Sequence, residues 1–241
     1  MQAGVKKRVL IDFLIPEFGD QTRMGKLAID IALVVSFAFL TAIFAQMSVK
    51  IPTTTVPITG QTFGVLLTGG ALGSRRGGLS MSVYMLMGML TLPVFAPKAS
   101  IMADKTFHVV FPWSGTGGQV WDLSSGGYIV GFIFAAYLVG FLAERGWDRR
   151  STIPLAMIAG NLSIYIIGLP WLAAFIGSGA VIPGLDLTYY DAISGNGVVD
   201  KTLKGGLYPF IGGDALKLLA AASILPGAWA IVDRIKRSTK E

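Results

Sequence analysis

The chain has 241 residues, of which 53% are apolar and 14% are charged, whereas an average soluble domain carries about 25% charged residues. A soluble fold could not bury this much apolar surface, and the same composition excludes a disordered chain. With no cysteine and one histidine, the sequence offers neither a thiolate nucleophile nor a histidine cluster for a metal. These features indicate an integral membrane protein without catalytic machinery of its own.

Six apolar stretches, separated by glycine, proline and charge, predict an all-α bundle of six transmembrane helices. The predicted spans are approximately 27–47, 57–72, 77–92, 127–143, 153–176 and 210–232. The second and third are shorter than the ~20 residues that cross a bilayer and therefore require a packed bundle around them. Residues 1–26 are predicted to be a cytoplasmic or interfacial segment, either a short helix within 5–15 or a disordered tail, and 233–241 a basic cytoplasmic tail.

The positions of the basic residues predict the orientation. If the N-terminus is cytoplasmic, fourteen of the 20 lysines and arginines lie on the inner side, five lie on the outer side, and Lys217 lies within the sixth span. Every arginine is then inside, as the positive-inside rule requires. The net charge of +6 is thus explained by topology and by attraction to anionic lipid, and no nucleic-acid partner is expected.

Three outer loops predict that recognition takes place on the outer half. The loop at 48–60 contains two prolines and four threonines, which favours an extended, self-bonding loop. The loops at 93–126 and 177–209 exceed the ~15 residues beyond which a loop usually has a function. For 177–209 a lid, an oligomer contact or neither remains open, and His108 is expected to be an ordinary loop or interfacial residue.

The sixth span begins with PFIGGDALKLLAAA, in which Gly212 and Gly213 precede Asp214 as a predicted N-cap. Asp214 and Lys217 are three residues apart and therefore share one face of the helix, about one turn into the membrane. Ionisable groups at this depth normally face a bundle interior or a cavity. The pair is either an internal ion pair behind a helix cap or a polar anchor for a small ligand, and we favour the anchor.

Further polar candidates for the wall of a site lie within the predicted spans. They are Gln61, Tyr84, Tyr128, Asn161 and Tyr165. Each can donate or accept a hydrogen bond inside a bundle, and interhelical hydrogen bonding explains any one of them as well as ligand contact does.

Two pairs of alanines on the first span, Ala28 with Ala32 and Ala38 with Ala42, form AxxxA patterns. Such patterns create a smooth groove for close helix packing, either within the bundle or against another protein. The sequence contains no GxxxxGK[ST] motif for ATP and no chain of carboxylates through the spans for a proton relay. Any active transport therefore requires energy from another subunit.

Several of these segments resemble the BioY family, the biotin-binding S components of energy-coupling factor (ECF) transporters. They are IPTTTVPITGQTFGVLLTGGALGSRRGGLSMSVYMLMGMLTLPVFA at 51–96, GGYIVGF at 126–132 and GGDALKLL at 212–219. The resemblance implies a six-helix S-component bundle in a prokaryotic plasma or inner membrane that captures biotin at its outer face. It also implies a separate transmembrane coupling subunit and two ATPase subunits, which drive release by toppling the binding protein in the membrane.

The resemblance further assigns roles to residues. It makes Asp214 and Lys217 ligand contacts and brings a first-helix AxxxA pair against the coupling subunit, without deciding between the two pairs. Apolar walls for biotin would come from Phe63, Tyr84, Phe95 and Tyr128, with the 48–60 loop closing over them. One departure is Ser124 and Ser125, where the family pattern has Pro-Thr.

Other functions remain open on the sequence alone. The same scaffold could bind another small vitamin, or the chain could be a self-sufficient small-molecule transporter or a membrane-embedded enzyme, although the missing histidine, cysteine and acidic clusters disfavour the enzyme. A homo-oligomer is also possible. Neither a cofactor nor a metal is expected.

Overall fold

The computed structural model describes residues 9–14, 22–49, 54–97, 107–108, 115–148 and 152–238. The long helices are α2 (Arg23–Gln46), α3 (Gln61–Leu72), α4 (Ser74–Met89), α5 (Gly126–Ala143), α6 (Ile153–Gly177) and α9 (Tyr208–Ser238). The short helices are α1 (Ile11–Leu14), the 3-10 turn η1 (Val120–Asp122), α7 (Tyr189–Ala192) and α8 (Gly197–Gly206). Each predicted span coincides with one long helix, and the predicted all-α membrane fold is confirmed.

The helices differ in their ability to cross a membrane. Within the described residues, four stretches are long and apolar enough: α2, α5, α6 and the stretch from Gly197 to Arg234. Helices α3 and α4 have 12 and 16 residues, which corresponds to roughly 18 and 24 Å against a hydrocarbon core of about 30 Å. They therefore do not cross the hydrocarbon core on their own and depend on their packing against α5.

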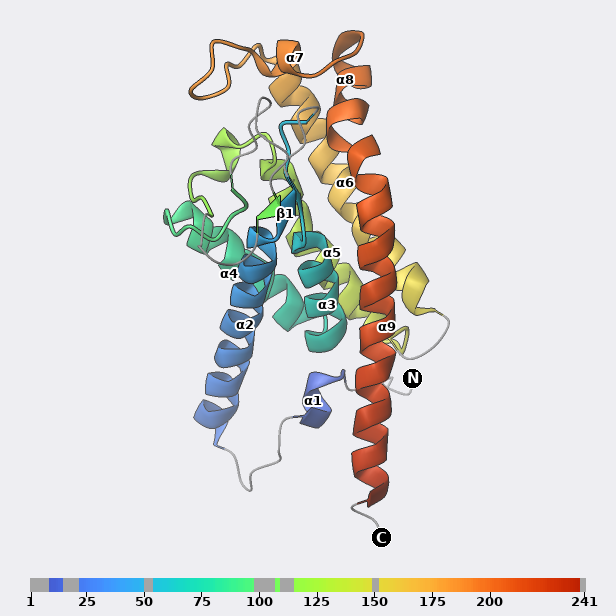
Figure 1. Cartoon of the computed structure of the whole chain (residues 1–241). Helices are drawn as coiled ribbons and strands as arrows, with labels where there is room; N and C mark the ends of the chain where they lie inside the picture. The colour runs from blue at the N-terminus through green and yellow to red at the C-terminus, as the bar shows by residue number, and fades with distance from the viewer. Residues whose placement is uncertain are drawn as a thin grey trace, which may run out of the picture.

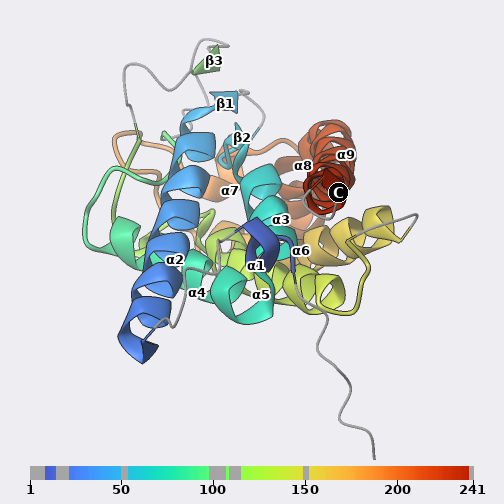
Figure 2. The same ribbon diagram turned by 90° about the horizontal axis from the view of Figure 1, so that it is seen from below.

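Helix α5 is the centre of the bundle and contacts α3, α4 and α6. In the most apolar 18-residue stretch of α5, 61% of the residues are buried, against 22% in that of α2. The exposed side of α2 is therefore available to lipid. Helices α2 and α9 flank the bundle, and α3 lies between them (Figures 1 and 2). The start of α2 and the end of α9 lie at the same end of the molecule (Figure 1), as expected when an even number of spans separates the two termini.

The turn between α3 and α4 is tighter than predicted. We expected Arg75 and Arg76 in an inner loop before a span starting at Gly77, but α4 begins at Ser74, directly after Gly73 with its positive φ of 84°. The Glu144 carboxylate accepts hydrogen bonds from the Ser74 amide (2.9 Å) and hydroxyl (2.8 Å), which satisfies a free N–H at the helix start. A neighbouring helix thus supplies the cap.

Arg76, in the first turn of α4, ties the inner ends of three helices together. Its guanidinium lies 2.6 Å from the Asp12 carboxylate of α1 and 2.8 Å from the Asp30 carboxylate of α2. Seen from below, α1 lies beneath α3 (Figure 2). Of the interfacial helix proposed within 5–15, the structure contains α1, while residues 1–8 lie outside the described residues.

The outer end carries a small antiparallel sheet formed by β1 (Ser48–Val49), β2 (Ile58–Thr59) and β3 (Phe107–His108) in the order β2-β1-β3. The second predicted span accordingly starts later than expected, because its first residues form β2 and the helix begins at Gln61. Within the first loop, the Thr54 hydroxyl accepts a hydrogen bond from the Val56 amide at 3.0 Å. The loop is thus extended at both ends and held by its own side chains.

Close packing between α3 and α5 generates the first prediction. A Cβ atom at Gly69 would lie 2.5 Å from the Ala136 carbonyl oxygen of α5, which is too close for any real contact. Gly69→Ala should therefore lower the free energy of unfolding by about 2 kcal/mol, measured as a reduced melting temperature of the detergent-purified protein. Gly227→Ala is the matched control, because a Cβ at Gly227 meets nothing within 4 Å. Equal melting temperatures for the two variants would contradict this packing.

Candidate ligand-binding site

A cavity of about 510 Å³ lies at the outer end of the bundle, within the roughly 300–1,000 Å³ typical of small-molecule sites. Its helical walls come from α3, α5, α6 and α9, and loops cover its outer side. The helix residues that line it are Gln61 and Thr62; Tyr128, Ile129 and Phe132; Asn161, Ile164 and Tyr165; and Phe210, Asp214 and Lys217. The cavity therefore draws on both halves of the chain.

One wall is organised around the Asp214 carboxylate, which is 4% exposed. It accepts hydrogen bonds from Lys217 Nζ (2.8 Å), Tyr165 Oη (2.6 Å) and Asn161 Nδ2 (3.2 Å). The predicted N-cap role of Asp214 is wrong, because α9 begins at Tyr208 and already forms a turn and a half before this residue. The carboxylate is therefore free to receive side-chain donors from α6.

This wall has no net charge but keeps unused hydrogen-bonding capacity. Lys217 and Asp214 neutralise each other, and only one of the three N–H donors of Lys217 is directed at Asp214. Among the described residues, the buried Asn161 Oδ1 atom has no hydrogen-bond partner. The wall can thus offer the remaining Lys217 donors and the remaining lone pairs of the Asp214 carboxylate to a neutral polar group.

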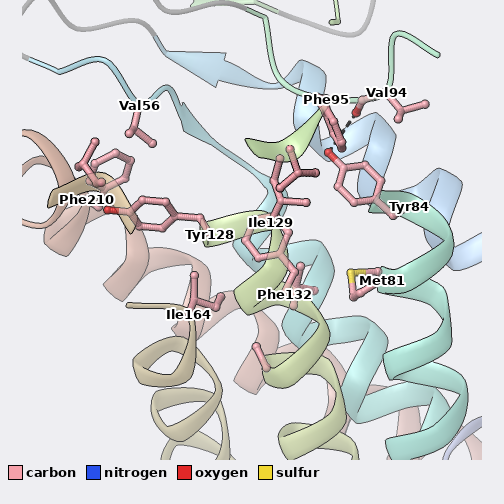
Figure 3. Packing of buried hydrophobic residues seen from close by; sticks show 14 of the residues in the cluster. Val56, Met81, Tyr84, Val94, Phe95, Tyr128, Ile129, Phe132, Ile164 and Phe210 are labelled. Carbon is pink, nitrogen blue, oxygen red and sulfur yellow. Dashed lines mark hydrogen bonds between the residues drawn. The ribbon is translucent and has the colours of Figure 1, made fainter. Parts of the chain in front are cut away.

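Gln61 contributes a second polar group to the lining, and Tyr84 fixes its orientation. The Gln61 amide nitrogen donates to Tyr84 Oη at 2.6 Å, and the Thr59 hydroxyl donates to its carbonyl oxygen at 2.8 Å. Tyr84 Oη in turn donates to the Val94 carbonyl at 3.1 Å, the contact drawn in Figure 3. Tyr84 is fully buried and does not line the cavity, so it acts on the cavity through Gln61.

Aromatic rings supply the apolar surface. Phe95 lines the cavity and packs edge-on against Tyr84 with ring centroids 5.5 Å apart. Tyr128 stacks on Phe210 at 6.5 Å, with Val56 of the first outer loop on the other side of Phe210 (Figure 3). Tyr128 Oη also donates to the Gly206 carbonyl at 2.9 Å, which satisfies its polar end and leaves its ring to the cavity.

Six of the eight predicted site residues therefore line one cavity: Gln61, Phe95, Tyr128, Asn161, Asp214 and Lys217. Tyr84 lies one layer behind, and Phe63 lies outside the lining, packed edge-on against Phe44 of α2 at 4.9 Å. Tyr165 was predicted as a polar group within a span, but its contact with Asp214 was not predicted. The spacing of Asn161 and Tyr165, four residues apart on α6, was the available signal.

The outer loops meet above the cavity. The Thr54 hydroxyl donates to the Gly205 carbonyl, and the Ser124 hydroxyl donates to the Thr55 carbonyl at 3.4 Å. Tyr189 also lines the cavity; burial raises the pKa of its phenol, an effect opposed by a hydrogen bond with Ser124. Ser124 stands where the family pattern has Pro-Thr. It contacts Thr55 of the first outer loop and Tyr189 of the third, and so links the three outer loops.

The two AxxxA pairs of α2 have different environments. Ala38 and Ala42 are 0% exposed and belong to the core cluster that includes Met81 and Tyr84 of α4. Ala28 and Ala32, nearer the inner end, are exposed. Of the two AxxxA pairs, Ala28 and Ala32 therefore have an exposed surface on which another protein could pack.

The profile of the BioY family matches residues 19–234 of the chain. The chain belongs to the BioY family. A BioY-family relative from Pyrococcus horikoshii, a probable biotin transporter, is 37% identical over 148 residues, which cover 61% of this chain and 76% of that protein. The biotin transporter BioY of Thermotoga maritima is 31% identical over 180 residues, covering 73% and 82% of the two chains.

A solved structure shares this BioY fold. It is the S-component for biotin from an ECF-type ABC transporter, which superposes with a TM-score of 0.59 at 19% sequence identity and covers 86% of this chain and 93% of that chain. The resemblance noted in the sequence is therefore confirmed, and the bundle has the architecture of an S component.

The buried ion pair yields the second prediction. Asp214→Asn keeps the shape of the side chain but leaves the Lys217 ammonium without its counter-charge, so it should lower the free energy of unfolding of the ligand-free protein by about 3 kcal/mol. The double variant Asp214→Asn/Lys217→Met should lose less than the sum of the single variants in a double-mutant cycle of thermal stability.

The exposed pair Asp200–Lys204, with nitrogen and oxygen 2.8 Å apart, provides the control cycle and should show no measurable coupling, because water screens surface ion pairs. Additive losses at Asp214 and Lys217 would show that the two groups do not depend on each other.

Proposed function

We propose that this BioY-family protein captures biotin at the outer face of a prokaryotic plasma or inner membrane. It would serve there as the substrate-specific subunit of an ATP-driven vitamin importer. The biotin-transporter names of its relatives support this function, as does its likeness in fold to the S-component for biotin. The protein itself would bind and release the ligand without chemical change.

The observation that carries the proposal is the polar wall at the ion pair of Asp214 and Lys217, which has no net charge, within a cavity with a large aromatic and aliphatic surface. Biotin combines a neutral ureido group, with two N–H donors and one carbonyl acceptor, an apolar bicyclic thioether, and a carboxylate on an alkyl chain. Lys217 has N–H donors for a carbonyl, and the Asp214 carboxylate can accept from an N–H. The rings of Phe95 and Tyr128 suit the apolar part.

Energy for import would come from separate subunits. The sequence contains no P-loop, and its spans contain no series of carboxylates for a proton relay. A transmembrane coupling subunit and two ATPase subunits would supply the driving force, as in an ECF-type transporter.

The coupling subunit would pack against Ala28 and Ala32 of α2, because the other AxxxA pair is already buried inside the bundle. A groove of small residues lets a partner helix approach closely, which is how helices associate in lipid. This choice also places the contact on the inner half of α2, far from the cavity.

Ligand identity is the third prediction. Native mass spectrometry of the detergent-purified protein should show an adduct of the mass of biotin, together with a raised melting temperature. Asp214→Asn and Lys217→Met should each weaken binding by about 1–3 kcal/mol, or roughly 5- to 150-fold, in a titration at equal protein concentration. Lys204→Met, an exposed outer residue, is the control and should bind as the parent does.

Two results would contradict this assignment. A folded protein that forms no biotin adduct, but binds another vitamin from a small panel, would make the chain an S component for a different ligand. Normal biotin affinity in both variants would show that the ion pair is structural only.

The contact with the coupling subunit is the fourth prediction. Ala28→Leu/Ala32→Leu should overpack the interface at a cost of about 2 kcal/mol and weaken assembly roughly 30-fold, while biotin binding by the isolated protein is unchanged. Co-purification with the coupling subunit measures assembly. Ala220→Leu, an equally exposed alanine on α9, is the control, and equal assembly by both variants would rule out this face of α2.

A further inference from the structure

Lys201 is a buried cation in the outer loop at 177–209, for which the sequence predicted no single function. It lies in the middle of α8 and is 7% exposed. Its Nζ atom donates to the Tyr190 carbonyl at 2.7 Å and the Ile193 carbonyl at 2.6 Å, and it lies 4.1 Å from the centre of the Tyr190 ring. Lysines in outer loops are usually solvated, so this burial requires an explanation.

The contrast with Lys204, one turn later on the same helix, shows that burial is specific to Lys201. The Lys204 side chain is 44% exposed and forms a surface ion pair with Asp200 at 2.8 Å. Lys201 instead holds two main-chain oxygens, one within α7 and one immediately after it. Its hydrogen bonds therefore join α8 to the segment that precedes it.

That segment, residues 180–194, forms part of the cover of the cavity and is here called the outer cap. The Ile182 amide donates to the Leu187 carbonyl and the Tyr189 amide to the Ala180 carbonyl, each at 2.9 Å, so the cap begins as a narrow hairpin. Ile182, Leu185 and Tyr189 of the cap line the cavity. In Figure 1 the cap and α7 lie at the end of the molecule opposite α1.

Glycines with positive φ lie at both ends of the outer cap: Gly179 at 70° and Gly195 at 136°. Such backbone conformations are readily accessible only to glycine, and a change of φ and ψ at these two residues would let the segment between them move as a unit. Within the described residues, the Lys201 contacts lie directly before the second of these hinges.

The opposite side of α8 is fixed to the rest of the site. Its last carbonyls, of Gly205 and Gly206, accept hydrogen bonds from Thr54 of the first outer loop and from Tyr128 of α5. A Cβ at Gly205 would lie 2.8 Å from the Ile193 side chain, so this glycine allows α8 to pack tightly against the cap. Helix α8 therefore connects the outer cap to the wall of the cavity.

We propose that Lys201 is a positioning residue that holds the outer cap closed over the cavity and so prolongs the retention of bound ligand. Retention of biotin rests on the proposed function. Closure of the cap does not, because it depends only on contacts within the chain. The chain has no cysteine, so hydrogen bonds and packing, all reversible, hold the cap. Opening would expose the Tyr190 and Ile193 carbonyls to water, which would satisfy them, so loss of Lys201 should release the cap without unfolding the bundle.

Cysteine labelling tests cap closure without a ligand. Ile193→Cys places a thiol at a site that is 0% exposed and next to the Lys201 contact, in a chain that has no other thiol. Adding Lys201→Met should accelerate maleimide labelling at position 193 by at least about tenfold, since two hydrogen bonds from a charged donor are lost. Lys204→Met is the matched control and should leave the rate unchanged, and Lys201→Arg, which retains charged donors, should restore most of the protection.

A second thiol distinguishes local opening from general loosening. Leu225 of α9 is also 0% exposed and lies on the inner half, so labelling of Leu225→Cys should not respond to Lys201→Met. Unchanged labelling at position 193, or equal acceleration at both positions, would overturn the proposal. If Lys201→Met is not monodisperse, Lys201→Gln, which keeps a shorter donor, replaces it and should label at an intermediate rate.

The ligand side of the proposal is measured separately. Lys201→Met should release bound biotin about tenfold faster than the parent, while Lys204→Met releases it at the parental rate. Faster labelling with an unchanged release rate would overturn the role in retention but not cap closure. If the parent protein binds no biotin, the proposed function fails, whereas the labelling result still decides whether Lys201 closes the cap.

Discussion

The cost of placing ionised groups at membrane depth determines how the outer half of this protein is built. Asp214 and Lys217 are tolerable there only because they neutralise each other and because the carboxylate receives two further donors, Tyr165 and Asn161. Those donors come from α6, so satisfying the ion pair draws α6 towards α9. The cavity forms where α5, α6 and α9 surround this polar group, with Tyr128 and Phe210 as its apolar boundary. The arrangement that satisfies the buried charges is thus also the one that forms the polar wall of the cavity.

The shortness of α3 makes room for that cavity. A helix of 12 residues cannot reach across the hydrocarbon core, so its first residue, Gln61, lies below the outer loops and contributes a polar group to the wall instead of a lipid-facing surface. Glycine packing compensates for the small contact area of α3: Gly69 approaches the main chain of α5 so closely that no side chain fits. A full-length helix in this place would fill the volume that the site occupies.

The sequence predicted the features that depend on composition along one helix. Hydrophobic runs located the six long helices, and the spacing of Asp214 and Lys217 put both on one face. It could not predict helix rotation where a helix is apolar all round, and so Phe63, two residues after Gln61, was placed in the wall although it contacts Phe44. The Gly212–Gly213 pair suggested a helix start, but packing of α8 and α9 against the bundle overrides this local preference. Lys201 resembled any other loop lysine, since its partners are main-chain atoms.

Whether a side chain binds another side chain or a main-chain atom distinguishes the polar wall of the site from its cover. The polar part of the wall depends on contacts between buried side chains, such as Asp214 with Tyr165 and Gln61 with Tyr84. In the cover, by contrast, Ser124 binds the Thr55 carbonyl and Lys201 binds the Ile193 carbonyl. A carbonyl released from such a contact at the outer end meets water at once, so the net loss is about 1 kcal/mol for a neutral donor. A carboxylate or amide released inside the bundle has no such substitute. In the proposed closure by Lys201, the cover would therefore open while the wall stays intact, as ligand entry would require.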